Sequence, residues 1–153
     1  MLEWYPVIGL LLIACITDLL YRKIPNGLLL VGATYGLVSS FFGVGHVVFA
    51  EAVLGLLVGL LIFSFPYYKA WIGAGDVKLM GVLGVYLGPQ LTIAAAIYTM
   101  FAGGILALIY ICTQGRMREK LGNLMKFQTS DSRIPYATAI LVGSSFAILM
   151  SRE

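Results

Sequence analysis

The stretch Gly73-Ala74-Gly75-Asp76-Val77-Lys78-Leu79 places a carboxylate directly after two glycines, at the start of an apolar segment. An ionisable side chain beside a long apolar segment is costly to bury, and such residues in membrane segments are by default candidates for function. A second carboxylate, Asp18, lies near the end of the first apolar run, which covers about residues 4–20. We therefore expect the fold to be organised so that these two acids act together.

The composition indicates an integral membrane protein. Of the 153 residues, 60% are hydrophobic and only 11% are charged, and the mean hydropathy is +0.95. A soluble domain is about 45–50% apolar and about 25% charged. About six membrane-spanning helices of roughly 20 residues each would use most of the chain and leave short loops. The sequence predicts an all-α, polytopic helical bundle, formed by residues 1–153 as a single domain.

Proline and glycine mark the expected helix ends. The first helix should end near Ile24, since the residue before a proline avoids the α region, and Asn26 is expected to cap the second helix. The fourth apolar segment covers only about 18 Å as a helix, short of the roughly 30 Å hydrocarbon core. Either the glycine-rich stretch enters the membrane as a loop, or the helix continues past Pro89 with a kink. The expected helices after the first cover about residues 26–42, 51–68, 77–88, 91–112 and 134–150.

The basic residues predict the orientation. Nine of the ten Lys and Arg residues fall in the first, third and fifth loops or beside them, and only Arg152 falls on the other side. By the positive-inside rule these loops face the cytoplasm and both termini face out. Asp18 and Asp76 are therefore predicted to lie on the same, cytoplasmic, side. The same distribution explains the net charge of +3 without a nucleic-acid partner.

Metal and cofactor sites are not indicated. Cys15 and Cys112 both lie in apolar segments and form no CxxC pair, so we expect buried free thiols. His46 is expected to be a loop residue. The glycines of the 73–79 stretch match neither a phosphate-binding loop nor a dinucleotide-binding fingerprint. Met117, Leu121, Leu124 and Met125 recur at helical spacing with charged residues between them, which predicts an amphipathic helix on the inner membrane surface.

Two carboxylates that meet can share a proton, so that the ionised one activates water while the protonated one assists a carbonyl group. Structural alternatives exist: Asp18 could pair with Arg22 one helical turn later, and Asp76 could cap the helix that begins at Val77, or pair with Lys78.

The neighbours of Asp76 are candidates for substrate binding. Gly73 and Gly75 could let an extended substrate segment pair with the backbone, or could form a flexible turn. Lys78 could tune Asp76 or orient a substrate, or could simply extend its ammonium group to the membrane surface.

These residues resemble the type IV prepilin peptidases, which are GxGD intramembrane aspartic proteases. The resemblance rests on Asp18 followed by Ile24-Pro25-Asn26, on Gly73-Ala74-Gly75-Asp76 with Val77-Lys78-Leu79, and on Ile134-Pro135-Tyr136-Ala137 before the last span. It implies that Asp18 and Asp76 are the catalytic pair and that Gly73, Gly75, Lys78 and Asn26 are candidates for substrate binding. It also implies cleavage of a precursor with a basic leader and an apolar helix, at the cytoplasmic border of the cell membrane, without metal or other cofactor.

The chain departs from the larger bacterial members, which carry a domain with paired CxxC motifs and also methylate the new N-terminus. Its first loop has only a few residues and no CxxC motif, which argues against methylation and favours the short forms that serve Flp/Tad-type pili or archaeal filaments. Two other functions stay open: a small proton- or ion-coupled transporter that uses the same acids, and an assembly subunit in which they are structural. The oligomeric state is not predicted.

Overall fold

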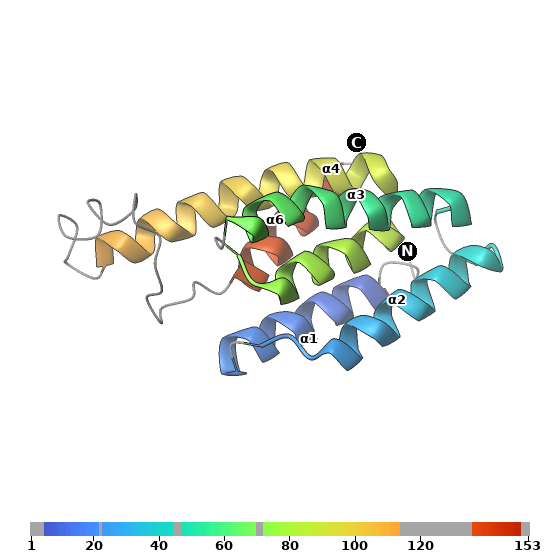
Figure 1. Ribbon diagram of the computed structural model, residues 1–153, viewed down its shortest axis with the longest axis horizontal. Helices are drawn as coiled ribbons and strands as arrows, with labels where there is room; N and C mark the ends of the chain where they lie inside the picture. The colour runs from blue at the N-terminus through green and yellow to red at the C-terminus, as the bar shows by residue number, and fades with distance from the viewer. Residues whose placement is uncertain (1–4, 22, 45–46, 70–71, 114–135, 151–153) are drawn as a thin grey trace.

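The computed structural model describes residues 5–21, 23–44, 47–69, 72–113 and 136–150, and these residues form an all-α bundle (Figure 1). The predicted all-α class is thereby confirmed. The described helices are α1 (Tyr5–Tyr21), α2 (Asn26–Phe41), α3 (Phe49–Tyr68), α4 (Ala74–Thr113) and α6 (Tyr136–Met150).

Helix α4 is broken at Gly88, where the sequence predicts the end of the fourth apolar segment. Gly88 has φ 72° and ψ 173°, a conformation that a residue without a Cβ adopts readily. Pro89 follows, and its ring fixes a φ that suits the first turn of the next helical segment. Figure 1 shows that the chain runs back along the bundle after this break. The residues before and after Gly88 therefore form two roughly antiparallel segments.

The segment of α4 before Gly88 forms the centre of the bundle. Leu79, Met80, Leu83 and Val85 are fully buried there. Helix α3 packs closely along α4, because glycines face each other: a Cβ on Gly55 or on Gly84 would overlap the backbone oxygen of the other residue. Small residues that let helix backbones approach are typical of membrane bundles, in which van der Waals packing drives helix association.

Helix α6 packs against α4 and, less extensively, against α1. Gly143 of α6 touches the backbone and hydroxyl of Thr99 in α4. The hydroxyls of Thr99 and Ser144 are buried, and each donates to a carbonyl of its own helix. The first turn of α6 lies beside the last turn of α1, where the backbone N–H of Ala137 donates to the Asp18 carboxylate.

Two of the described helices are long and apolar enough to cross a membrane, namely Phe49–Tyr68 and, within α4, Ala74–Leu106. Three shorter apolar helices accompany them: Val7–Tyr21, Asn26–Phe41 and Ala137–Met150. About six spans and an outward N-terminus stay predictions. Three predictions concern parts that lie outside the described residues: the expected amphipathic helix, His46 and Arg22. The side chain of Cys112 is not described either. Cys15 is a free thiol whose side chain is half-buried.

Two expectations about helix starts are wrong. Asn26 does not cap α2: the cap residue is Pro25, no side chain caps the helix, and Asn26 is its first residue. Helix α4 begins at Ala74 rather than at Val77, so Gly75 and Asp76 belong to its first turn and not to a loop. The reason is local, since Gly73 can serve as the cap residue and an acid three positions later favours a helix N-terminus.

Candidate active site

The two predicted acids lie at the same end of the bundle. Asp18 is in the last turn of α1, and Asp76 is in the first turn of α4. Figure 1 shows the C-terminal ends of α1 and α3 beside the N-terminal ends of α4 and α6. The two acids therefore lie where these four helices end or begin, and the cytoplasmic side that the charge distribution predicts for them stays a prediction.

The Asp76 side chain is 9% exposed, and it contacts Gly73, the residue that precedes α4. Its carboxylate oxygen Oδ2 accepts a hydrogen bond from the backbone N–H of Gly73 at 3.1 Å. In return the Gly73 carbonyl accepts from the N–H groups of Asp76 and Val77, at 3.2 and 3.4 Å. Since Gly73 has no side chain, the bond from its N–H to Asp76 is one half of a capping box, and a negative charge in the first turn also suits the helix dipole. The alternative that Asp76 caps a helix is thus realised, although it reaches back to Gly73 instead of preceding Val77.

Asp18 is half-buried and faces the start of α6. Its Oδ2 accepts from the backbone N–H of Ala137, with the nitrogen 3.4 Å away. The two residues are 119 positions apart in the sequence, so a local pattern cannot reveal this contact. The only sequence signal near it is the Ile134-Pro135-Tyr136-Ala137 motif that precedes the last helix.

The residues around Asp76 meet the turn that joins α1 to α2. The Lys78 ammonium group donates to the Asn26 side-chain oxygen Oδ1 at 3.0 Å. A Cβ on Gly75 would lie 3.4 Å from the Cβ of Ile24, so the Ile24 side chain rests on the first turn of α4. Lys78 and Asn26, both predicted to bind substrate, thus contact each other.

The glycines do not form the loop that the sequence suggests. Of the stretch that precedes Asp76, only Ile72 and Gly73 are described outside the helix, and Gly75 is helical. Gly75 therefore has helical rather than extended backbone geometry in this conformation. As the second residue of α4 it still has an N–H group of the kind that a helix N-terminus leaves without an intrahelical partner, so its predicted contact with substrate stays a prediction. Gly73 stays a candidate for contact with substrate.

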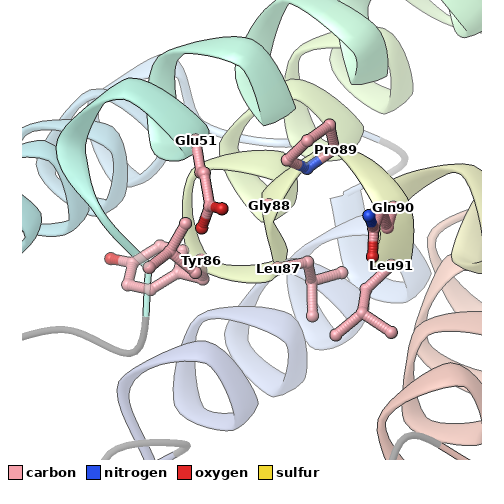
Figure 2. A pocket seen from close by; sticks show the side chains of 8 residues that line it. Glu51, Tyr86, Leu87, Gly88, Pro89, Gln90 and Leu91 are labelled. Atoms are coloured by element: carbon pink, nitrogen blue, oxygen red, sulfur yellow. The ribbon is translucent and has the colours of Figure 1, made fainter.

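One pocket among the described residues lies away from the acids. It has a volume of about 250 Å³ and surrounds the break at Gly88, and Figure 2 shows Glu51 and Tyr86 beside that break. Asp76 is twelve residues before Gly88, about 18 Å along the helix. Among the described residues, no three His, Cys, Asp or Glu side chains gather as a metal site.

The described residues form an all-α bundle that has two helices long and apolar enough to cross a membrane and two acids at one end, and comparison with known proteins adds the family. A sequence model described as the type IV leader peptidase family matches residues 6–108, more than half of the chain. The chain therefore belongs to the type IV leader peptidase family. The matched region includes both Asp18 and Asp76, as well as Asn26 and Lys78.

Two curated relatives are both named prepilin leader peptidase/N-methyltransferase. The protein from Bacillus subtilis (strain 168) is 28% identical over 97% of this chain and 56% of its own length. The protein from Myxococcus xanthus (strain DK1622) is 23% identical over 82% of this chain and 39% of its own length. The chain thus spans about half the length of these relatives or less. No solved structure shows a significant match.

Proposed function

We propose that this chain is a membrane-embedded aspartic endopeptidase that removes the leader peptide from type IV prepilin-like precursors. The observation that carries the proposal is the placement of Asp18 and Asp76 at one end of the bundle, within the region that matches the leader peptidase family. The substrate class follows from the family description and from the names of the relatives.

The proposed reaction uses water and two carboxyl groups. The ionised carboxylate takes a proton from water, whose oxygen attacks the scissile carbonyl carbon, while the protonated carboxyl donates its proton to the carbonyl oxygen. The tetrahedral intermediate then collapses, the C–N bond breaks, and the leaving amine takes up a proton from the pair. Because the proton belongs to the pair, neither Asp18 nor Asp76 is assigned as the permanent acid.

The membrane arrangement belongs to the same proposal. About six helices would cross the cytoplasmic or inner cell membrane, with the N-terminus outside and the acids at the cytoplasmic border. The precursor would present a basic leader in the cytoplasm and an apolar helix in the bilayer. The lack of CxxC motifs in the sequence supports peptidase activity without methylation, and neither the family nor the relatives support an ion-coupled transporter.

The test is co-expression with small prepilin-like precursors, with loss of the leader read by mass spectrometry. Asp18→Asn and Asp76→Asn keep the shape of the side chain but remove the acid, and each is expected to lower cleavage by roughly 10²-fold to 10⁴-fold. Immunoblots of the membrane fraction check that both variants accumulate normally. If either variant cleaved at near wild-type rate, the two-carboxylate mechanism would be wrong.

A further inference from the structure

The turn between α1 and α2 is fastened to the first turns of α4 by two contacts. One is apolar, between Ile24 and the helix surface at Gly75. The other is polar, from the Lys78 ammonium group to Asn26 Oδ1 at 3.0 Å. Ile24 also packs against the main hydrophobic core. The contacts join segments about 50 residues apart, and they lie directly beside Asp76.

These contacts bear on the distance between the two acids. Helix α1, which carries Asp18, makes its main helix contacts with α2 and α6, whereas Asp76 is on α4. The chain from Asp18 to Ile24 spans at most about 20 Å even when fully extended. Fixing Ile24 on α4 therefore limits how far Asp18 can move from Asp76.

The position of Lys78 on its helix favours this structural connection over a direct effect on Asp76. Residues two apart on a helix do not face each other, so the Lys78 side chain leaves the helix in a different direction from that of Asp76. An ammonium group has three donors and no acceptor, and the Asn26 oxygen occupies one of those donors. The long side chain thus bridges from α4 to the start of α2.

We propose that Ile24, Asn26 and Lys78 are positioning residues that form a latch between the α1–α2 turn and α4, and that the latch holds Asp18 within reach of Asp76. The expected effect of the latch on cleavage rests on the proposed peptidase function. The latch itself is a contact whose existence can be measured without any cleavage. We define the latch as these three side chains together with Gly75.

The first experiment measures the contact by disulfide formation. In a Cys15→Ala/Cys112→Ala background, the pair Ile24→Cys/Gly75→Cys places two Cβ atoms about 3.4 Å apart, close to the 3.5–4.5 Å of disulfides. Mild oxidation of isolated membranes should cross-link the two cysteines. The measurement is the mass of the protein after treatment with a maleimide, because cross-linked cysteines no longer take up the reagent. The matched control is Ile24→Cys/Gly104→Cys, since Gly104 lies in the same helix with no atom within 4 Å of a Cβ there. Equal cross-linking of both pairs would overturn the latch.

The second experiment tests the polar half. Adding Lys78→Met or Asn26→Leu to the Ile24→Cys/Gly75→Cys pair should slow cross-linking about fivefold, the size expected for losing one exposed hydrogen bond of ordinary net strength. Asn26→Asp keeps the acceptor oxygen and should cross-link at the parent rate. In the protein with its native Ile24 and Gly75, thermal midpoints of Asn26→Leu, Lys78→Met and the double variant should be non-additive. If the shifts in thermal midpoint were strictly additive, or if the cross-linking rate were unchanged, Lys78 and Asn26 would not be part of the latch.

The third experiment separates positioning from direct action on substrate. Lys78→Met alone should lower kcat for leader cleavage about fivefold with little change in KM. Oxidising the Ile24→Cys/Gly75→Cys pair in the same variant should restore most of that loss, because the disulfide replaces the latch. If the oxidised pair cleaves while Lys78 is present but fails to restore cleavage in Lys78→Met, Lys78 acts on substrate and the latch is not its role. If the protein with native Ile24, Gly75 and Lys78 cleaved no precursor, the proposed function would fail, while cross-linking would still decide whether the latch exists.

Discussion

Asp76 has two roles that can be separated at the level of single atoms. Its Oδ2 holds the N–H of Gly73 and so shapes the start of α4, while the proposed chemistry uses its ability to gain and lose a proton. A hydrogen-bond acceptor is sufficient for the first role. Only an acid can take part in the proposed proton transfer. A substitution that keeps the acceptor but removes the acid should therefore affect cleavage without affecting the start of α4.

Asp76→Asn should lower leader cleavage by roughly 10²-fold to 10⁴-fold with little loss of stability, because the amide oxygen can still accept from Gly73. Asp76→Ala should lower cleavage at least as much and should also lower the free energy of unfolding by about 1 kcal/mol, the usual net value of one hydrogen bond. Thermal midpoints of the detergent-solubilised variants and precursor mass check both statements. Equal stability of the Asn and Ala variants would show that the Gly73 contact contributes nothing.

At the level of elements, the contact between α3 and α4 depends on two glycines. Gly55 and Gly84 each approach the backbone oxygen of the other so closely that no Cβ fits. Because backbone atoms rather than flexible side chains fill the space, relief requires the two helices to separate. That separation would move the segment of α4 that carries Asp76.

Gly84→Ala should therefore lower the free energy of unfolding by about 1–3 kcal/mol, as expected for overpacking, and should reduce cleavage. Gly104→Ala is the matched control, because it lies in the same helix with no atom within 4 Å of a Cβ. Alanine is the better helix former, so this control should be neutral or stabilising by up to about 1 kcal/mol. Thermal midpoints in detergent measure both, and a Gly84→Ala variant as stable as the control would contradict the packing.

The sequence predicts the helices well where proline or glycine controls the backbone. The break at Gly88 and the end of α1 before Pro25 follow from local conformational limits. The start of α4 was open to prediction as well, since Gly73 and Asp76 have the spacing of a capping box. Asn26 fails as a cap because Pro25 takes that position, and its side chain instead accepts from Lys78 of a distant helix.

The local sequence predicts only some of the contacts in the candidate site. Counting basic residues places Asp18 and Asp76 on one side, and the structure has them at one end of the bundle. The contact from Ala137 to Asp18 joins residues 119 positions apart, and the contact of Ile24 with Gly75 depends on how α2 and α4 pack. Such contacts are decided by tertiary packing, for which helix periodicity carries no information.

At the level of the whole molecule, one end of the bundle must face the cytoplasm if the peptidase proposal holds. Helix α3 has 20 residues, about 30 Å in length, which matches the hydrocarbon core of a bilayer. Its C-terminal end lies beside the acids, and Val44 precedes its other end. Both Val44 and Tyr68 are strongly exposed, at 69% and 86%, so the two positions can report the orientation without disturbing the core.

In the Cys15→Ala/Cys112→Ala background, a membrane-impermeant maleimide added to intact cells should label Val44→Cys and leave Tyr68→Cys unlabelled until the cells are opened. The reason is that the loop assignment predicts nine of the ten basic residues on the Tyr68 side, and basic loops stay in the cytoplasm. Neither substitution changes a charge, so the orienting signal is intact in both variants. The opposite pattern would put Asp18 and Asp76 on the outer side, where a basic leader that remains in the cytoplasm could not reach them.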